Sequence, residues 1–166
     1  MSYSIDVLVQ NATEPVTPPF SSSIVLKSEL DSPFFERYHE IWPFFSSIRG
    51  IMYSLVQDTG DEYYSSFPLC DSDFDLQLES LPFLIEKEED VMYHLTAFYV
   101  KEEFFSDFLK LVHFLLTTAP DKRILFHTRY QGGEREVILG VVKWENFVKM
   151  LKKRAVYFNI CYIIEL

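Results

Sequence analysis

The sequence predicts an α+β fold: a single domain with a mixed, mainly antiparallel sheet packed against two or three helices. Three observations lead to this prediction. Runs rich in β-branched and aromatic residues recur along the chain, two segments place apolar residues at helical spacing, and 166 residues suit one hydrophobic core. We therefore treat residues 1–166 as a single globular domain, with an acidic, loop-rich segment at residues 57–90.

The N-terminal half predicts three strands and a helix. Residues 3–9 alternate between apolar and polar side chains, and we expect two further strands at residues 24–27 and 50–57. Residues 32–42 begin with Ser-Pro, a typical helix start, and carry an apolar stripe at helical spacing. In the acidic segment that follows, we expect loop with one short strand around residues 74–78.

The C-terminal half predicts more regular structure. We expect a strand at residues 91–100 and then a long helix at 101–118, where apolar residues recur at spacings of three and four. The stretches ILFHTRY and REVILGVVK predict a hairpin that turns at Gly132-Gly133. A short helix with a basic outer face is expected at residues 144–151, and a central strand in the final run, residues 155–166.

The net charge of −10 is distributed unevenly. Residues 1–90 hold 17 acidic and 4 basic residues, whereas residues 91–166 hold 8 and 11. Residues 57–90 alone carry 11 acidic residues against Lys87. Such a charge disfavours binding to nucleic acid or to an anionic membrane, and it favours a basic protein partner.

No motif indicates a metal site, a cofactor or a catalytic set. In a calcium loop that began at Asp71, the sixth position would be Leu76 instead of Gly and the twelfth Pro82 instead of Glu. The loose carboxylate cluster of Asp71, Asp73 and Asp75 could still hold a hard cation, and the alternative is a solvated acidic loop. Histidines and cysteines at metal-ligand spacing, a nucleophile elbow and a phosphate-binding loop are all absent from the sequence.

The chain is expected to act in the cytoplasm. Its N-terminus lacks the basic start of a signal peptide, and no stretch is apolar for the roughly 18 residues that suggest a membrane span. Cys70 and Cys161 lie far apart beside apolar residues, which is typical of reduced thiols. We expect His94, His113 and His127 to be packed histidines.

The acidic segment is the candidate partner-binding surface. Its carboxylates would attract a basic surface, and its aromatic rings would supply the packed contacts that dominate binding energy. The alternative for Phe74 is that it anchors the loop to the core. The basic face of the helix at 144–151, with Lys149, Lys152 and Lys153, is expected to contact this acidic segment. The candidate residues are Asp58, Asp61, Glu62, Tyr63, Tyr64, Asp71, Asp73, Phe74, Asp75 and Glu79.

In size, acidity, aromatic content and lack of a catalytic set, the chain resembles the small acidic immunity proteins of bacteria. These cytosolic proteins neutralise toxins of contact-dependent or polymorphic secretion systems. The resemblance lies in these class-level properties and involves no shared motif. It implies a binder, expected to be a monomer without a cofactor, that covers or distorts the active site of a toxin. The toxin of such a pair is often a nuclease with a basic groove.

Three other functions remain open from the sequence. A secretion chaperone is also small, acidic and α+β, and a stable homodimer would favour it. A nucleic-acid mimic that blocks a DNA-binding enzyme would use carboxylates in the same way, and only its target differs. An enzyme with a divalent metal at residues 71–75 is the third, and thermal stabilisation by a metal would support it.

Overall fold

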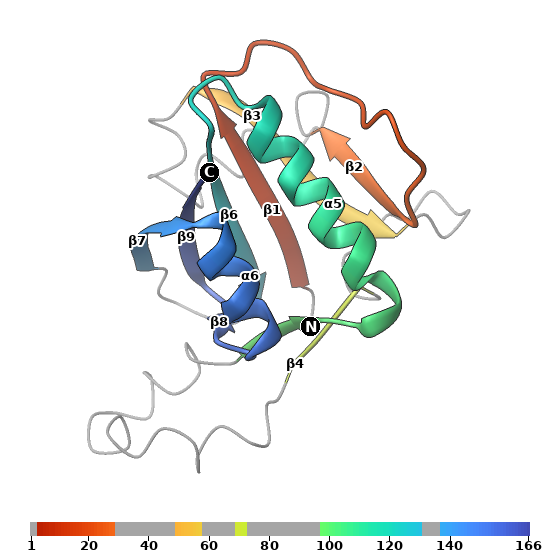
Figure 1. Ribbon diagram of the computed structural model, residues 1–166, viewed down its shortest axis with the longest axis vertical. Helices are drawn as coiled ribbons and strands as arrows, with labels where there is room; N and C mark the ends of the chain where they lie inside the picture. Colours follow the sequence, from red (N-terminus) through yellow and green to blue (C-terminus); the bar gives the residue numbers. More distant parts are fainter. Residues whose placement is uncertain (1–2, 29–48, 58–68, 73–96, 131–136) are drawn as a thin grey trace.

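The computed structural model describes residues 3–28, 49–57, 69–72, 97–130 and 137–166, which form an α+β fold with two sheets and two helices (Figure 1). The order of the larger sheet is β2-β3-β1-β6-β9-β7, and all its pairings are antiparallel except that between β7 and β9. The smaller sheet has the order β4-β5-β8. The predicted fold class is therefore confirmed. The strands of the larger sheet are β1 (Tyr3–Gln10), β2 (Ile24–Ser28), β3 (Gly50–Gln57), β6 (Arg123–Tyr130), β7 (Val137–Lys143) and β9 (Ile160–Glu165); those of the smaller are β4 (Cys70–Ser72), β5 (Ala97–Val100) and β8 (Val156–Tyr157).

Helix α5 (Glu102–Thr118) and helix α6 (Trp144–Lys152) pack on the same face of the larger sheet (Figure 1). The apolar residues of α5 recur at helical spacing, so one face of the helix is buried. Two acidic residues in its first turn stabilise the positive end of the helix dipole. The buried residues of α5 are Phe104, Phe108, Leu111, Val112, Leu115 and Leu116, and those of α6 are Phe147 and Leu151.

The alternation of side chains along β1 separates the two faces of the sheet. Ile5, Val7 and Val9 point into the main core beneath the helices. Leu8 lies on the opposite face, in a second buried apolar cluster with Met52, Leu125 and Cys161. The two-residue alternation in the β1 sequence therefore separates two faces of the sheet, and both faces carry buried apolar residues.

Aromatic rings fill the main core. The Phe98 and Phe158 rings meet edge to face at 5.5 Å, and the Phe126 and Phe147 rings do so at 5.0 Å. Such pairs contribute about 0.5–1.5 kcal/mol each beyond the burial of their surface. Much of the aromatic content therefore stabilises the core of the fold.

Most predicted elements in the described residues are confirmed, and one pairing is wrong. The strands at the N-terminus, at 24–27 and at 50–57, the long helix and the short helix all occur, and the last four residues of the strand predicted at 91–100 form β5. The two stretches predicted to form a hairpin are the strands β6 and β7. They are not neighbours, because β9 lies between them and pairs with both.

Two smaller differences concern the segments around β4 and β9. Part of the expected loop forms the strand β4. The final run holds two strands, β8 and β9, separated at Asn159, whose backbone is left-handed with φ of 60°. The predicted helix at 32–42, the predicted strand at 74–78 and the turn at Gly132-Gly133 lie outside the described residues.

Candidate functional site

Of the ten residues predicted to contact a partner, the structure places only Asp71. This residue lies in β4, directly opposite Tyr99 of β5. The other nine lie outside the described residues, so their role in partner binding stays a prediction. They are Asp58, Asp61, Glu62, Tyr63, Tyr64, Asp73, Phe74, Asp75 and Glu79.

The acidic segment is attached to the folded body at defined points. β3 ends at Gln57, where the segment begins, and β4 lies within the segment and pairs with β5. Leu69, just before β4, is fully buried, and its carbonyl accepts a hydrogen bond of 3.0 Å from the Lys101 amide. The charged segment is therefore anchored to the smaller sheet through its middle as well as to the end of β3.

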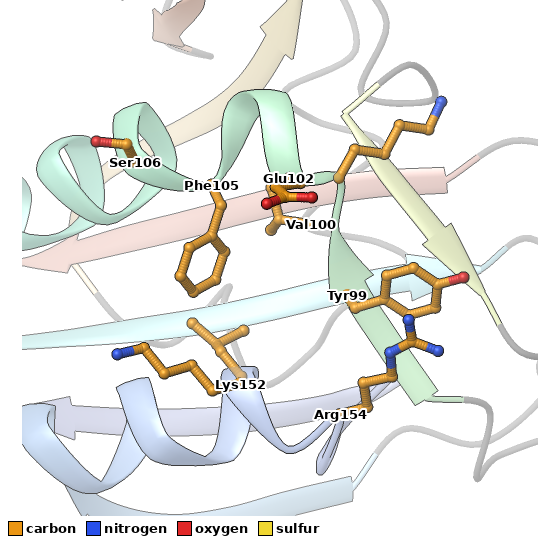
Figure 2. A pocket seen from close by; sticks show the side chains of 9 residues that line it. Tyr99, Val100, Glu102, Phe105, Ser106, Lys152 and Arg154 are labelled. Atoms are coloured by element: carbon orange, nitrogen blue, oxygen red, sulfur yellow. The ribbon is translucent and has the colours of Figure 1, made fainter.

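An open groove lies beside this anchor, between the start of α5 and the end of α6 (Figure 2). Its volume is about 560 Å³, and Val100, Phe105 and Leu151 contribute its apolar surface. In Figure 2 the Phe105 ring extends into the groove from α5, and Tyr99 lies at one end. Because the groove is open to solvent, it suits a protein segment better than a small molecule, which an enclosed pocket would surround.

Three basic residues and one acidic residue line the groove. The basic residues are Lys101, Lys152 and Arg154, and the acidic residue is Glu102. The Arg154 guanidinium carbon lies 4.0 Å from the centre of the Tyr99 ring, in a cation–π contact. At exposed sites such a contact contributes about 0.5–1 kcal/mol. The groove therefore combines an aromatic surface with a local positive charge. One of its lining residues, Tyr99, is the residue that pairs with Asp71 of the acidic segment.

The basic face of α6 is exposed, as its sequence suggests. Lys149, Lys152 and Lys153 are all exposed, and none forms an ion pair with another described residue. The predicted contact between this face and the acidic segment involves residues outside the described part of the chain. It stays a prediction.

A buried polar row crosses the sheet face opposite the helices. Register places Ser54 of β3 opposite Asp6 of β1, and Asp6 opposite His127 of β6. All three are less than 8% exposed, and the Ser54 hydroxyl donates a hydrogen bond of 2.6 Å to Asp6 Oδ1. Cys161 of β9 lies opposite His127 on the other side and is also buried. The row thus brings a carboxylate, an imidazole and a thiol onto adjacent strands.

The protonation of His127 limits what this row can do chemically. Burial, with a smaller contribution from the charge of Arg129, lowers the pKa of His127 to about 3. The imidazole is therefore neutral at physiological pH, and its basicity is too low for a general base working near neutrality. Cys161 is only 3% exposed, which restricts access of a substrate to its thiol. The row therefore serves as part of the folded structure.

An ion-pair network lies on the same face, at the end of the sheet. The Arg123 guanidinium contacts Glu165 Oε1, with an Nε–Oε1 distance of 2.9 Å, and Lys143 Nζ lies 3.4 Å from Glu165 Oε2. The hydrogen bond from Arg123 is the main cause that lowers the pKa of the Glu165 carboxyl. Because the three side chains are partly exposed, we assign this network a structural role of modest energy.

Sequence patterns could not identify the groove or the buried row. Asp6 and His127 are 121 residues apart, and only the register of β1 and β6 brings them together. The sequence indicates the lysine-rich helix that contributes to the basic part of the groove. It does not indicate that this helix lies near Tyr99 and Phe105. Of the histidines expected to be packed, His127 is buried. His113 is exposed on α5, where its ring lies 5.2 Å from the Trp144 ring in a tilted contact. His94 lies outside the described residues.

The described residues hold neither a metal-binding cluster nor a membrane-spanning helix. No group of three or more His, Cys, Asp or Glu side chains there has an arrangement that could hold a metal ion. Neither of the two helices described has both the length and the apolar character needed to cross a membrane. The chain matches no family model, no curated protein and no solved structure.

Proposed function

We propose that this protein is a non-enzymatic binding protein that neutralises a basic protein partner through its acidic segment, residues 57–90. One observation supports the proposal most strongly. The segment holds 11 of the 25 acidic residues and a single basic residue, and the rest of the chain holds 14 acidic and 14 basic residues. The entire net charge of −10 therefore belongs to 34 consecutive residues.

Concentrated charge of this kind destabilises a protein that stays alone. Carboxylates held close together repel one another, and the remainder of the fold has to offset that repulsion. A partner with a basic surface changes the repulsion into attraction and accelerates the encounter, by roughly ten- to a thousand-fold in favourable cases. The anchoring of the segment at β3 and β4 supports this proposal, because it fixes two points of the segment, one of them next to Asp71, to the folded body.

Aromatic residues would provide most of the affinity. Tyr63, Tyr64 and Phe74 lie among the carboxylates in the sequence, and rings of this kind are the usual energetic centres of protein interfaces. Tyr99 and Phe105 of the neighbouring groove extend the proposed interface onto the folded body. The carboxylates would then govern the association rate, and the rings the dissociation rate.

The most specific form of the proposal is an immunity protein that protects a bacterium from a cognate toxin. Acting in the cytoplasm, it would occupy the basic cleft of the toxin, where the carboxylates take the positions that substrate phosphates would otherwise fill. A nuclease toxin fits this description best, because its nucleic-acid groove is basic. The resemblance in size, acidity and aromatic content supports this form.

Affinity capture tests the proposal. The purified protein is immobilised and exposed to an extract of its native host at low and at moderate salt, and the retained proteins are identified by mass spectrometry. An unrelated protein with the same net charge is the control for ion exchange. We expect a basic protein that the control does not retain and that is progressively lost as salt rises. Capture of no specific protein, or of one whose retention does not depend on salt, would contradict the proposal.

A further inference from the structure

Among the described strands, none pairs with the outer edge of β7. β7 is the last strand of the larger sheet, and among the described residues β9 is its only paired neighbour (Figure 1). The backbone N–H and C=O groups on the other side of such a strand form a row that another strand can pair with. Two side chains of β7 are also exposed although they are apolar: Leu139 at 52% and Val141 at 54%.

Before its last residue, the sequence of β7 lacks two common protections of an edge strand, charged residues and proline. Proteins commonly place charged residues or proline on exposed edges to prevent pairing. β7 reads VILGVVK, so its first six residues are uncharged and Lys143 stands alone at the end. A bulge makes Leu139 an extra residue relative to β9, and the Leu139 side chain is exposed. The edge is therefore apolar as well as unpaired among the described strands.

Val141 connects the edge to the interior of the sheet. By register, Leu8, Leu125, Ile163 and Val141 lie side by side across β1, β6, β9 and β7. The first two are nearly inaccessible to solvent, Ile163 is partly buried, and Val141 is exposed. This apolar row thus continues to the edge strand and ends there in solvent.

We propose that a second copy of this chain pairs with β7 through its own β7, in an antiparallel arrangement about a two-fold axis at Gly140. Most soluble homo-oligomers have this symmetry. The register places Leu139 opposite Val141 of the second copy, so the exposed apolar side chains cover each other. Lys143 faces the uncharged Val137 position, which keeps the two ammonium groups apart. Gly140 has no side chain to hinder the close approach of a second backbone.

The size and the charge of this interface set its strength. One pair of seven-residue strands is smaller than the roughly 1,200–2,000 Å² that stable complexes bury, so we expect a weak dimer, on the order of 100 μM. Each copy carries a net charge of −10, which opposes association. Salt screens this repulsion and should strengthen the dimer. Binding of a basic partner should weaken with salt, so the two associations are distinguishable. At low micromolar concentrations the protein should therefore be the monomer that the sequence analysis expects.

Sedimentation analysis from 5 μM to 1 mM, at 50 and 500 mM salt, tests the inference with the protein itself as the probe. We expect dimerisation that increases with concentration and salt, and at least a ten-fold weaker association for L139K/V141K. The control S106K/N146K adds the same two charges at exposed helical positions and should still dimerise. Circular dichroism verifies that both variants are folded.

Hydrogen exchange provides a second measurement on the unmodified chain. Among residues 139–142, exchange of the backbone amides that point away from β9 should slow as concentration rises, because pairing protects them. The inference is overturned by a monomer at every concentration, by a dimer that persists unchanged in L139K/V141K, or by a dimer that salt dissociates. It does not depend on the proposed function, because it requires neither the acidic segment nor a partner.

Discussion

Asp6, Ser54 and His127 occupy one buried row on the sheet, and each has a definite energetic consequence. A polar group that is removed from water needs a partner, because burying it alone costs about 1–3 kcal/mol. The Ser54 hydroxyl supplies one such bond to Asp6. Burial lowers the pKa of His127, so its imidazole is neutral near pH 7. Both effects can be measured with single substitutions.

Replacing His127 should change how stability depends on pH. The pKa of His127 is about 3 in the folded protein and near 6.5 when unfolded, so between these values the unfolded state binds the additional proton. Stability should therefore fall as pH drops from 6.5, by at most about 1.4 kcal/mol per pH unit from this group. Urea unfolding between pH 5 and 7.5 measures this, above the range where most carboxylates titrate.

H127Q should remove this part of the pH dependence, because glutamine does not titrate. The control is N146Q, a substitution at an exposed position that removes no titratable group. If the unfolding free energies of H127Q and of the natural protein changed equally with pH between pH 5 and 6.5, the conclusion that His127 is buried in its neutral form would be wrong.

Substitution S54A removes a hydroxyl from the buried carboxylate of Asp6. We expect the free energy of unfolding to fall by about 1–3 kcal/mol, because Asp6, which is 2% exposed, loses the hydrogen bond that Ser54 donates. S106A, at an exposed position, should change it by less than about 0.5 kcal/mol. Chemical denaturation compares the two, and equal values would show that the hydrogen bond contributes little.

At the scale of elements, the sequence determined which segments are strands better than how they pair. The alternating residues of β1, the apolar run of β3 and the helical spacing in α5 are local signals, and each element occurs as predicted. Pairing is a non-local property. β6 and β7 are joined by a short, glycine-containing connection, yet β9, rich in β-branched residues, pairs with both. Nothing in the local sequence encodes this insertion.

Gly50 illustrates a constraint that acts between elements. A Cβ atom at this position would lie 2.3 Å from the backbone oxygen of Val9 in β1, too close for any side chain. Because the obstacle is backbone, it cannot move without disrupting the β1–β3 pairing. We therefore expect G50A to destabilise the protein by more than about 2 kcal/mol.

The control for G50A is S106A, at an exposed position where the loss of a side-chain hydroxyl leaves the backbone and the sheet unchanged. Thermal unfolding of both, with secondary structure measured by circular dichroism, separates the effects. A G50A protein as stable as the natural one would mean that β1 and β3 approach less closely than the structure indicates.

At the scale of the whole molecule, the net charge is confined to one segment of the sequence. The net charge of −10 lies in residues 57–90, and the remaining residues balance to zero. This separation can be read from the sequence, because it depends on composition alone. The sequence could not predict the anchoring of the segment at β4 or the neighbouring groove with Tyr99 and Arg154, because both depend on contacts between distant segments. The charge would favour binding to a basic protein, and the β4 anchor and the groove would position that partner on the fold.

The most direct test measures the association rate with the captured partner at several salt concentrations. D71K/D73K/D75K reverses three charges inside the acidic segment, and E14K/D121K/E145K makes the same change of charge at exposed sites outside it. We predict that the first variant associates at least ten-fold more slowly at low salt, with a flatter salt dependence, and that the second stays close to the natural protein. Equal rates for the two variants would contradict the claim that residues 57–90 recognise the partner.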